Sequence, residues 1–262
     1  MSLPALSNWD ATRKSLHLAA QVIGGIRKVS IQPLPNYAHL GLYIVKDGLT
    51  SGRLEDGGEL RLDLALSNVS YIQPDGTPST LPLQGYTQAS LTNAVLKAMA
   101  DAGHPASNVD LSKIADQTPL TVDARTAAEY QQALYSVYTA ITRFRARLIG
   151  MMSPVIVFPH GFDASFLWFK RGAEERSDPH LNFGFSPGSA GFPRPYVYSY
   201  ASPMPANYFD VKLPPIARFV RDPWKGIVID YDKFAAESDS ESVLEQTLIE
   251  IQTANRTFIG VK

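Results

Sequence analysis

The 262-residue chain contains no cysteine and no surplus of charge of either sign. Without cysteine it cannot form disulfides, use a thiolate nucleophile or bind zinc through sulfur. Its 24 basic and 25 acidic residues give a formal net charge of −1, whereas proteins that bind phosphate backbones carry a basic surplus. We therefore expect no nucleic acid among the partners of this protein.

Long apolar runs are also missing. The most apolar stretch, residues 148–158, is interrupted by Pro154, and a membrane-spanning helix needs about 20 apolar residues. Charged residues interrupt the N-terminal segment where a signal peptide would need an apolar core. We expect a cytoplasmic protein without membrane contact. Because no glycine-rich phosphate loop occurs, we also expect no nucleotide cofactor, and the sequence indicates no other cofactor.

Apolar residues make up 45% of the chain, and in four segments they recur with the period of an amphipathic helix. The first predicted helix starts at a capping-box pattern, Ser7–Asp10, and ends at Gly24–Gly25. The second runs from about Thr87 to Ala102. The third follows Thr126–Glu129 and runs to Leu148, and the fourth follows Ser238–Glu241.

Alternating or short apolar runs between these segments predict strands. They cover residues 26–32, 40–46, 60–66, 69–73, 154–158, 165–170, 196–201 and 226–231. Their short connections favour antiparallel pairing over parallel crossovers. The sequence therefore predicts an α+β fold in which helices pack on a mainly antiparallel sheet, saddle-like by analogy.

The two halves of the chain resemble each other. Residues 23–33 align without a gap on residues 149–159, and each half then continues with strands and a further helix. We predict one compact domain, residues 1–262, with an internal pseudo-repeat over residues 1–105 and 122–258. Prolines and glycines concentrated at residues 174–223 indicate a loop-rich insertion.

Short motifs are spread over nearly the whole chain. They include Leu16-His17-Leu18 with Gln21, Asn36 and His39 before Leu42-Tyr43, Gly48-Leu49-Thr50, Arg145–Gly150, Phe162-Asp163, Ser189–Phe192 and Tyr198-Ser199-Tyr200. In these motifs the chain resembles a bacterial family of unknown function, domain-of-unknown-function family 5996. The family has no assigned chemistry, so the resemblance implies membership without implying an activity.

Two histidines are the first candidates for chemistry. His39 and His160 occupy corresponding connections of the predicted repeat, and Asp163 lies close enough in sequence to orient the imidazole of His160 as an acid–base pair. Asn36 and Tyr37 would add polar groups beside His39. The same residue types could hold a metal ion in a facial arrangement, or both histidines could be separate loop residues bonded to backbone carbonyls.

Aromatic residues at strand spacing are the second candidates. Tyr196, Tyr198 and Tyr200 alternate and so project from one face of a strand, where Trp168 and Phe162 could join them around a planar or sugar-like ligand. Alternatively, these aromatic residues have a structural role and pack against neighbouring strands in the core. Arg147, at the end of the third helix, could contribute to an anion pocket or simply complement the helix dipole.

A nucleophile-elbow pattern at Gly184-Phe185-Ser186-Pro187-Gly188 is not followed by a helix-forming segment or a later histidine, so we exclude a hydrolase of that type. We predict small-molecule binding by Asn36, Tyr37, His39, Phe162, Trp168, Tyr198, Tyr200 and Arg147. An enzyme that uses His160 and Asp163 is one alternative. A homo-oligomeric scaffold or interaction protein, such as a homodimer, is the other.

Overall fold

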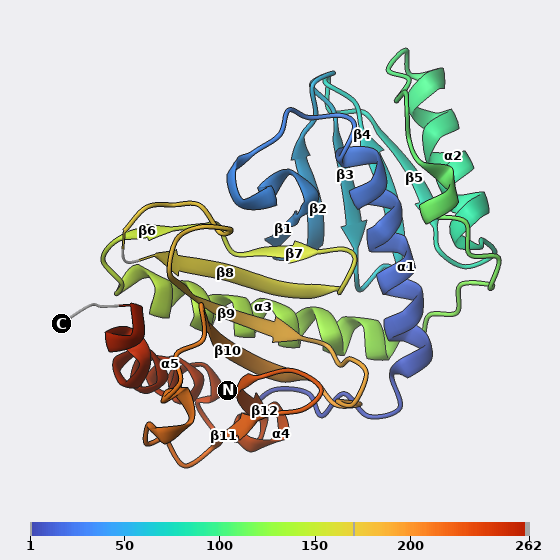
Figure 1. Cartoon of the computed structure of the whole chain (residues 1–262). Coiled ribbons are helices and arrows are strands. Elements are labelled where there is room, and N and C mark those ends of the chain that lie inside the picture. Colours follow the sequence, from blue (N-terminus) through green and yellow to red (C-terminus); the bar gives the residue numbers. More distant parts are fainter. Residues whose placement is uncertain (1, 170, 260–262) are drawn as a thin grey trace. The chain divides into compact units, whose positions relative to one another are not determined.

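The computed structural model describes residues 2–169 and 171–259, in which helices and antiparallel strands follow one another along the chain (Figure 1). Contacts divide the chain into two units. The first unit comprises Leu6–Tyr135 and Val157–Phe162, and the second comprises Met1–Ala5, Ser136–Ile156 and Asp163–Lys262. The single domain, the internal repeat and the insertion at residues 174–223 remain predictions.

The α-helices are α1 (Asp10–Arg27), α2 (Gln88–Asp101), α3 (Ala124–Ala146), α4 (Asp232–Ala235) and α5 (Ser240–Asn255). Shorter 3-10 helices are η1 (Pro35–Leu40), η2 (Leu111–Lys113), η3 (Tyr208–Asp210) and η4 (Arg256–Ile259). The strands of the first half of the chain are β1 (Leu42–Val45), β2 (Gly48–Arg53), β3 (Glu59–Asp63), β4 (Asn68–Ile72) and β5 (Pro78–Pro82). Those of the second half are β6 (Met151–Met152), β7 (Ile156–Phe158), β8 (Asp163–Phe169), β9 (His180–Ser186), β10 (Tyr196–Ser202), β11 (Ala217–Val220) and β12 (Gly226–Asp230).

In the first unit, β1 to β5 form an antiparallel meander in sequence order, and β7 lies beside β1. Side chains alternate between the two faces of such a sheet, so Leu60 and Leu62 of β3 are buried together with Val69 of β4. Helix α1 packs on β2 and β3, and α2 packs on β4, β5 and α1 (Figure 1). This pattern confirms the prediction of helices on an antiparallel sheet.

Helix α1 passes through Gly24 and Gly25, where the sequence predicted its end. A β-carbon at Gly24 would lie 2.5 Å from the ring of Pro159, and one at Gly25 would lie 3.2 Å from Ile114. The glycines therefore allow close packing against the helix rather than terminating it. The predicted strand at residues 26–32 is consequently wrong. The predicted capping box is also wrong, because the N-cap residue is Trp9 and no side chain caps this helix start.

The other predicted helices are confirmed with small shifts at their ends. Thr87 caps α2 through a reciprocal capping box with Ser90, and Asp239 caps α5 by accepting a hydrogen bond from the amide of Ser242. Strands β2 and β5 were not predicted, because β2 contains glycine and β5 contains proline. Strands β9 and β11 were not predicted, because both lie in residues 174–223, which the sequence indicated as a loop-rich insertion. Among the described residues, no helix is long and apolar enough to cross a membrane.

In the second unit the strands pair antiparallel in the order β8-β9-β10-β12-β11, and β6 pairs with β8 (Figure 1). One face of this sheet is apolar. Phe166 and Phe183 lie on that face with ring centroids 5.6 Å apart, and Phe144 of α3 packs edge-on against both rings. The opposite face carries tyrosines and other polar side chains.

Candidate functional site

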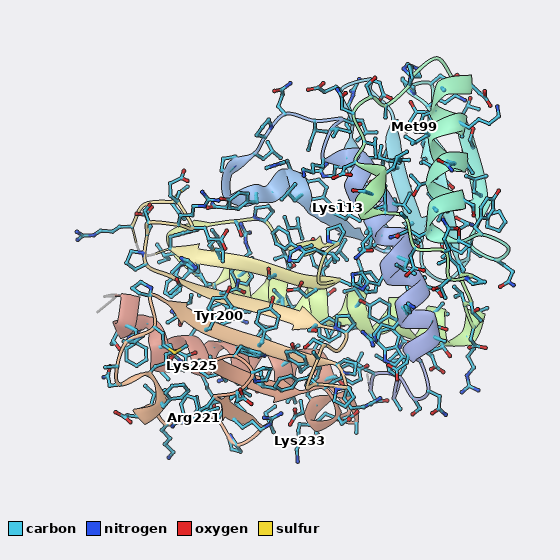
Figure 2. All side chains as sticks on the ribbon, turned by 45° about the vertical axis from the view of Figure 1, so that its right-hand side comes forward. Met99, Lys113, Tyr200, Arg221, Lys225 and Lys233 are labelled. Atoms are coloured by element: carbon cyan, nitrogen blue, oxygen red, sulfur yellow. The ribbon has the colours of Figure 1, made fainter. Side chains whose placement is uncertain are left out.

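The register of β8, β9 and β10 determines which side chains share the polar face. Gly184 pairs with both Ser165 and Tyr198, and Asn182 pairs with Tyr200. Because directly opposed residues project to the same side of a sheet, these residues lie on one surface. We call it the tyrosine face and name by it the residues Asp163, Ser165, Asn182, Gly184, Ser186, Tyr196, Tyr198 and Tyr200. Leu167, paired with Asn182, and Phe169, paired with His180, project to the same side. Figure 2 labels Tyr200 over the strands of the second unit.

Tyr198 is bound to Asp163 across the tyrosine face. Its hydroxyl donates a hydrogen bond of 2.5 Å to Oδ2 of the Asp163 carboxylate. The ring crosses β9 at Gly184, the position on this strand where the absence of a side chain leaves room for it. Burial of the phenol, reinforced by the negative charge of Asp163, raises the pKa of Tyr198 well above its ordinary value. Tyr198 is therefore a protonated donor rather than a general base.

Tyr200 and Asn182 form the second pair on this face. The Asn182 Nδ2 group donates to the Tyr200 hydroxyl oxygen at 3.0 Å, and the rings of Tyr200 and Tyr198 lie parallel with centroids 6.4 Å apart. Burial, followed by the charge of Glu175, raises the pKa of Tyr200. Asn182 is 5% exposed, and within the described part of the chain its Oδ1 atom has no hydrogen-bond partner.

The structure thus brings together Asp163, Tyr198 and Tyr200 of the predicted site residues. Asn182 and Gly184, which complete this group, were not predicted. We call Asp163, Asn182, Tyr198 and Tyr200 the Asn182 cluster. The alternation His180, Asn182, Gly184, Ser186 is a strand signal in which each small or polar residue faces the same side, but β9 was not predicted because it lies in residues 174–223, which the sequence indicated as a loop-rich insertion.

Trp168 and Arg147 lie elsewhere in the second unit. Trp168 pairs with Leu181 and therefore projects from the face opposite the tyrosines; its indole Nε1 donates to the carbonyl of Ile149 at 3.0 Å. Arg147 forms an ion pair with Glu245 of α5 at 2.6 Å. The structure therefore does not place these two residues in the Asn182 cluster.

Asn36, Tyr37 and His39 lie in η1 of the first unit. Asn36 and Tyr37 have φ angles of 50° and 57°, in the left-handed region that side chains disfavour. His39 Nδ1 accepts a hydrogen bond from the Leu34 amide at 3.2 Å. The buried guanidinium of Arg27 donates to the backbone carbonyls of Ser51 and Ala38, and so ties η1 to β2. Asparagine adopts this region more readily than other side chains do, so Tyr37 is the strained position of η1.

His160 and Phe162 also belong to the first unit. His160 is exposed and lies edge-on to Phe158, with ring centroids 6.0 Å apart. Phe162 is 1% exposed and stacks on His17 at 5.3 Å. Its side chain therefore belongs to the core of this unit, where it also lies 5.7 Å from the ring of Tyr130.

His17 is the histidine that sequence reasoning missed. Its Nε2 atom lies 2.7 Å from the Pro159 carbonyl and 3.1 Å from Gln21 Nε2. Burial lowers the pKa of His17, and the neighbouring charges of Arg13 and His160 lower it further. The spacing of His17 and Gln21 by one helical turn is the sequence signal for this contact.

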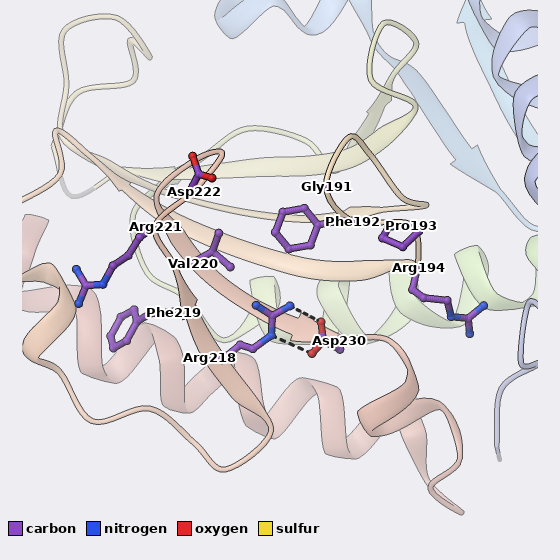
Figure 3. A pocket seen from close by; sticks show the side chains of 10 residues that line it. All are labelled: Gly191, Phe192, Pro193, Arg194, Arg218, Phe219, Val220, Arg221, Asp222 and Asp230. Carbon is purple, nitrogen blue, oxygen red and sulfur yellow. Dashed lines mark hydrogen bonds and ion pairs between the residues drawn. The ribbon is translucent and has the colours of Figure 1, made fainter.

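A hollow of about 460 Å³ lies beside β11 and β12 of the second unit's sheet (Figure 3). It is lined by Gly191, Phe192, Pro193, Arg194, Arg218, Phe219, Val220, Arg221, Asp222 and Asp230. Arg218 of β11 binds Asp230 of β12 through two hydrogen bonds, Nε to Oδ2 at 3.0 Å and Nη2 to Oδ1 at 2.7 Å. Through residues 2–169 and 171–259, no group of three or more histidine, aspartate or glutamate side chains is placed to hold a metal ion.

Comparison with known proteins supports the resemblance seen in the motifs. No curated protein matches the chain. A model described as a family of unknown function (DUF5996) matches residues 2–254, which is nearly the whole sequence. The chain therefore belongs to the family of unknown function DUF5996.

Proposed function

We propose that the protein binds a small molecule at the Asn182 cluster. The observation that supports this most strongly is the Oδ1 atom of Asn182, which is buried and, among the residues that the structure describes, unpartnered. Burying a polar atom without a partner costs about 1–3 kcal/mol. Folded proteins satisfy nearly all such atoms. Asn182 Oδ1 shares this state with Asn255 Oδ1, but only Asn182 lies among the aromatic and polar side chains of the tyrosine face, where a ligand can supply the missing donor.

The chemistry of the cluster defines what that group must offer. Asn182 Oδ1 and the carboxylate of Asp163 are acceptors, whereas the Tyr200 hydroxyl can still donate because its oxygen is what accepts from Asn182. A ligand with several hydrogen-bond donors, such as hydroxyl or amino groups, complements this arrangement. The stacked rings of Tyr198 and Tyr200 would pack against the apolar face of a polyol or sugar.

Native mass spectrometry of freshly purified protein tests the proposal. The wild-type protein should show an excess mass that disappears on denaturation, or should acquire one after incubation with glycerol, glucose or ethanolamine. Asn182→Leu should lose it. Asn255→Leu is the matched control, because Asn255 is also a buried asparagine whose Oδ1 has no partner in the described structure, but it lies in α5. Equal retention by both variants would contradict the proposal.

The alternatives remain predictions. An acid–base pair of His160 and Asp163 would require the carboxylate that accepts from Tyr198 to serve the histidine as well. A homodimer or scaffold would use an exposed surface, and the same mass spectra would report a dimer directly.

A further inference from the structure

We infer that the hollow beside β11 is a second binding site, and that it takes a small organic anion with a flat apolar body, such as an aromatic carboxylate. This site is independent of the Asn182 cluster. Its volume of about 460 Å³ lies within the range of about 300–1,000 Å³ that small-molecule pockets occupy. Phe192, Arg218 and Asp230 face one another across it (Figure 3).

Arg218 is the anchor for the anion. One edge of its guanidinium is held by the Asp230 carboxylate. A guanidinium has five N–H donors, so the donors away from Asp230 remain available to a second acceptor. The hydrogen bonds between the two side chains raise the pKa of Arg218 and lower that of Asp230, so both stay charged. Because Asp230 fixes the orientation of Arg218, little side-chain entropy is lost when a carboxylate binds.

The other charged groups around the hollow leave Arg218 as the best-placed cation. Arg194 is bound to Asp232 and to the carbonyl of Ala5. Arg221 stacks on Phe209, with its guanidinium carbon 3.8 Å from the ring centroid. Asp222 lies in the turn next to Arg221 and apart from the Arg218–Asp230 pair (Figure 3).

Phe192 specifies the flat body of the ligand. Its ring lies 5.8 Å from the Arg218 guanidinium carbon, and packing against Tyr196 at 4.8 Å holds it in place. Val220, buried in β11, lies under the same space. An aromatic carboxylate can therefore place its ring beside Phe192 and its charge on Arg218. An inorganic anion uses the charge alone, and a neutral aromatic compound uses the ring alone.

The test is a titration with benzoate followed by amide chemical shifts of residues 191–194 and 218–222. Benzoate should bind the wild-type protein in the millimolar range, and both acetate and benzyl alcohol should bind at least about tenfold more weakly. Arg218→Gln should weaken benzoate binding by at least about tenfold. Phe192→Ala should weaken benzoate binding without changing the response to acetate.

Arg61→Gln is the matched control. Arg61 is likewise a half-exposed arginine on a strand, paired with Glu59 at 2.7 Å, but it lies in the first unit. Its substitution should leave benzoate affinity unchanged. Melting temperatures and amide spectra of each variant verify that it is folded. The inference is overturned if wild-type protein does not bind benzoate, if benzyl alcohol binds equally well, or if Arg218→Gln binds benzoate as the wild type does.

Discussion

Tyr198 lies so close to Gly184 of the neighbouring strand that a β-carbon at position 184 would be 2.3 Å from Cζ of the tyrosine ring. The same β-carbon would be 2.6 Å from the carbonyl oxygen of Ala164 on β8. The glycine is therefore what allows the Tyr198 hydroxyl to cross β9 and reach Asp163 on β8. Sheet packing and the polar cluster depend on the same missing side chain.

Gly184→Ala should destabilise the protein by about 1–3 kcal/mol, the usual cost of overpacking. Urea unfolding measures this loss. Part of the penalty comes from the ring, so it should be smaller when the same substitution is made in a Tyr198→Ala background. An equal penalty in both backgrounds would show that the ring contact with Gly184 is not the cause.

The high pKa of Tyr198 predicts a loss of stability in alkali. Because burial and the Asp163 charge raise this pKa in the folded state, the unfolded chain releases its proton first, at about pH 10. Stability from this group is fully present below that pH and falls as the pH rises further. Tyr198→Phe should therefore reduce the fall in unfolding free energy between about pH 9.5 and about pH 11, a range that brackets the ordinary tyrosine pKa. An unchanged slope would contradict this.

His17 predicts the opposite dependence at the acid end. Burial lowers its pKa in the folded state, whereas the unfolded chain takes up a proton at about pH 6.5. The stability linked to His17 is present above that pH and is lost as the pH falls below it. His17→Gln should therefore reduce the decrease in unfolding free energy that occurs as the pH is lowered from about 6.5 to about 5. An imidazole resonance of His17 that titrates at or above the ordinary histidine pKa would disprove the prediction.

Tyr37 is held in the left-handed region with φ at 57°. A residue with a side chain in this region is destabilised by about 1–2 kcal/mol. Glycine avoids this strain, but it loses more chain entropy on folding, which offsets about 0.5–1 kcal/mol of the gain. Tyr37→Gly should therefore raise the unfolding free energy by roughly 0.5–1 kcal/mol. Ser67→Gly, at a φ of 52°, is the matched control. A clear loss of stability for Tyr37→Gly alone would assign its side chain a structural role instead of the predicted binding role.

The apolar periodicity of the sequence was enough to predict the α+β class, the antiparallel pairing and the approximate positions of α1, α2, α3 and α5. It failed where a residue has a role in packing rather than in local structure. Gly24 resembles a helix stop, yet it lies inside α1. The ring of Pro159 packs so close to the helix at this position that no side chain would fit there. That contact joins residues far apart in the sequence, so no local pattern contains it.

The candidate site was predictable only in part, for a related reason. The alternation of Tyr198 and Tyr200 placed both on one strand face, but Asp163 and Asn182 reach that face through the register of β8 and β9. Trp168 was predicted beside the tyrosines, but it pairs with Leu181 and therefore lies on the other face of the sheet. The sequence does not specify this strand register. The unpartnered Oδ1 of Asn182 is a property of the assembled sheet, so composition and spacing give no sign of it.

The most direct test of the proposed function is the double variant Asn182→Leu with Tyr200→Phe, measured for both unfolding free energy and ligand binding. Replacing two hydrogen-bonded partners by apolar groups of similar shape is nearly neutral or stabilising when a buried polar atom was unsatisfied, and the gain here is up to about 1–3 kcal/mol. We predict that the double variant is as stable as the wild type or more stable, and that it no longer acquires the excess mass of a bound ligand. A variant that loses stability while binding as the wild type does would show that the Asn182 cluster is structural.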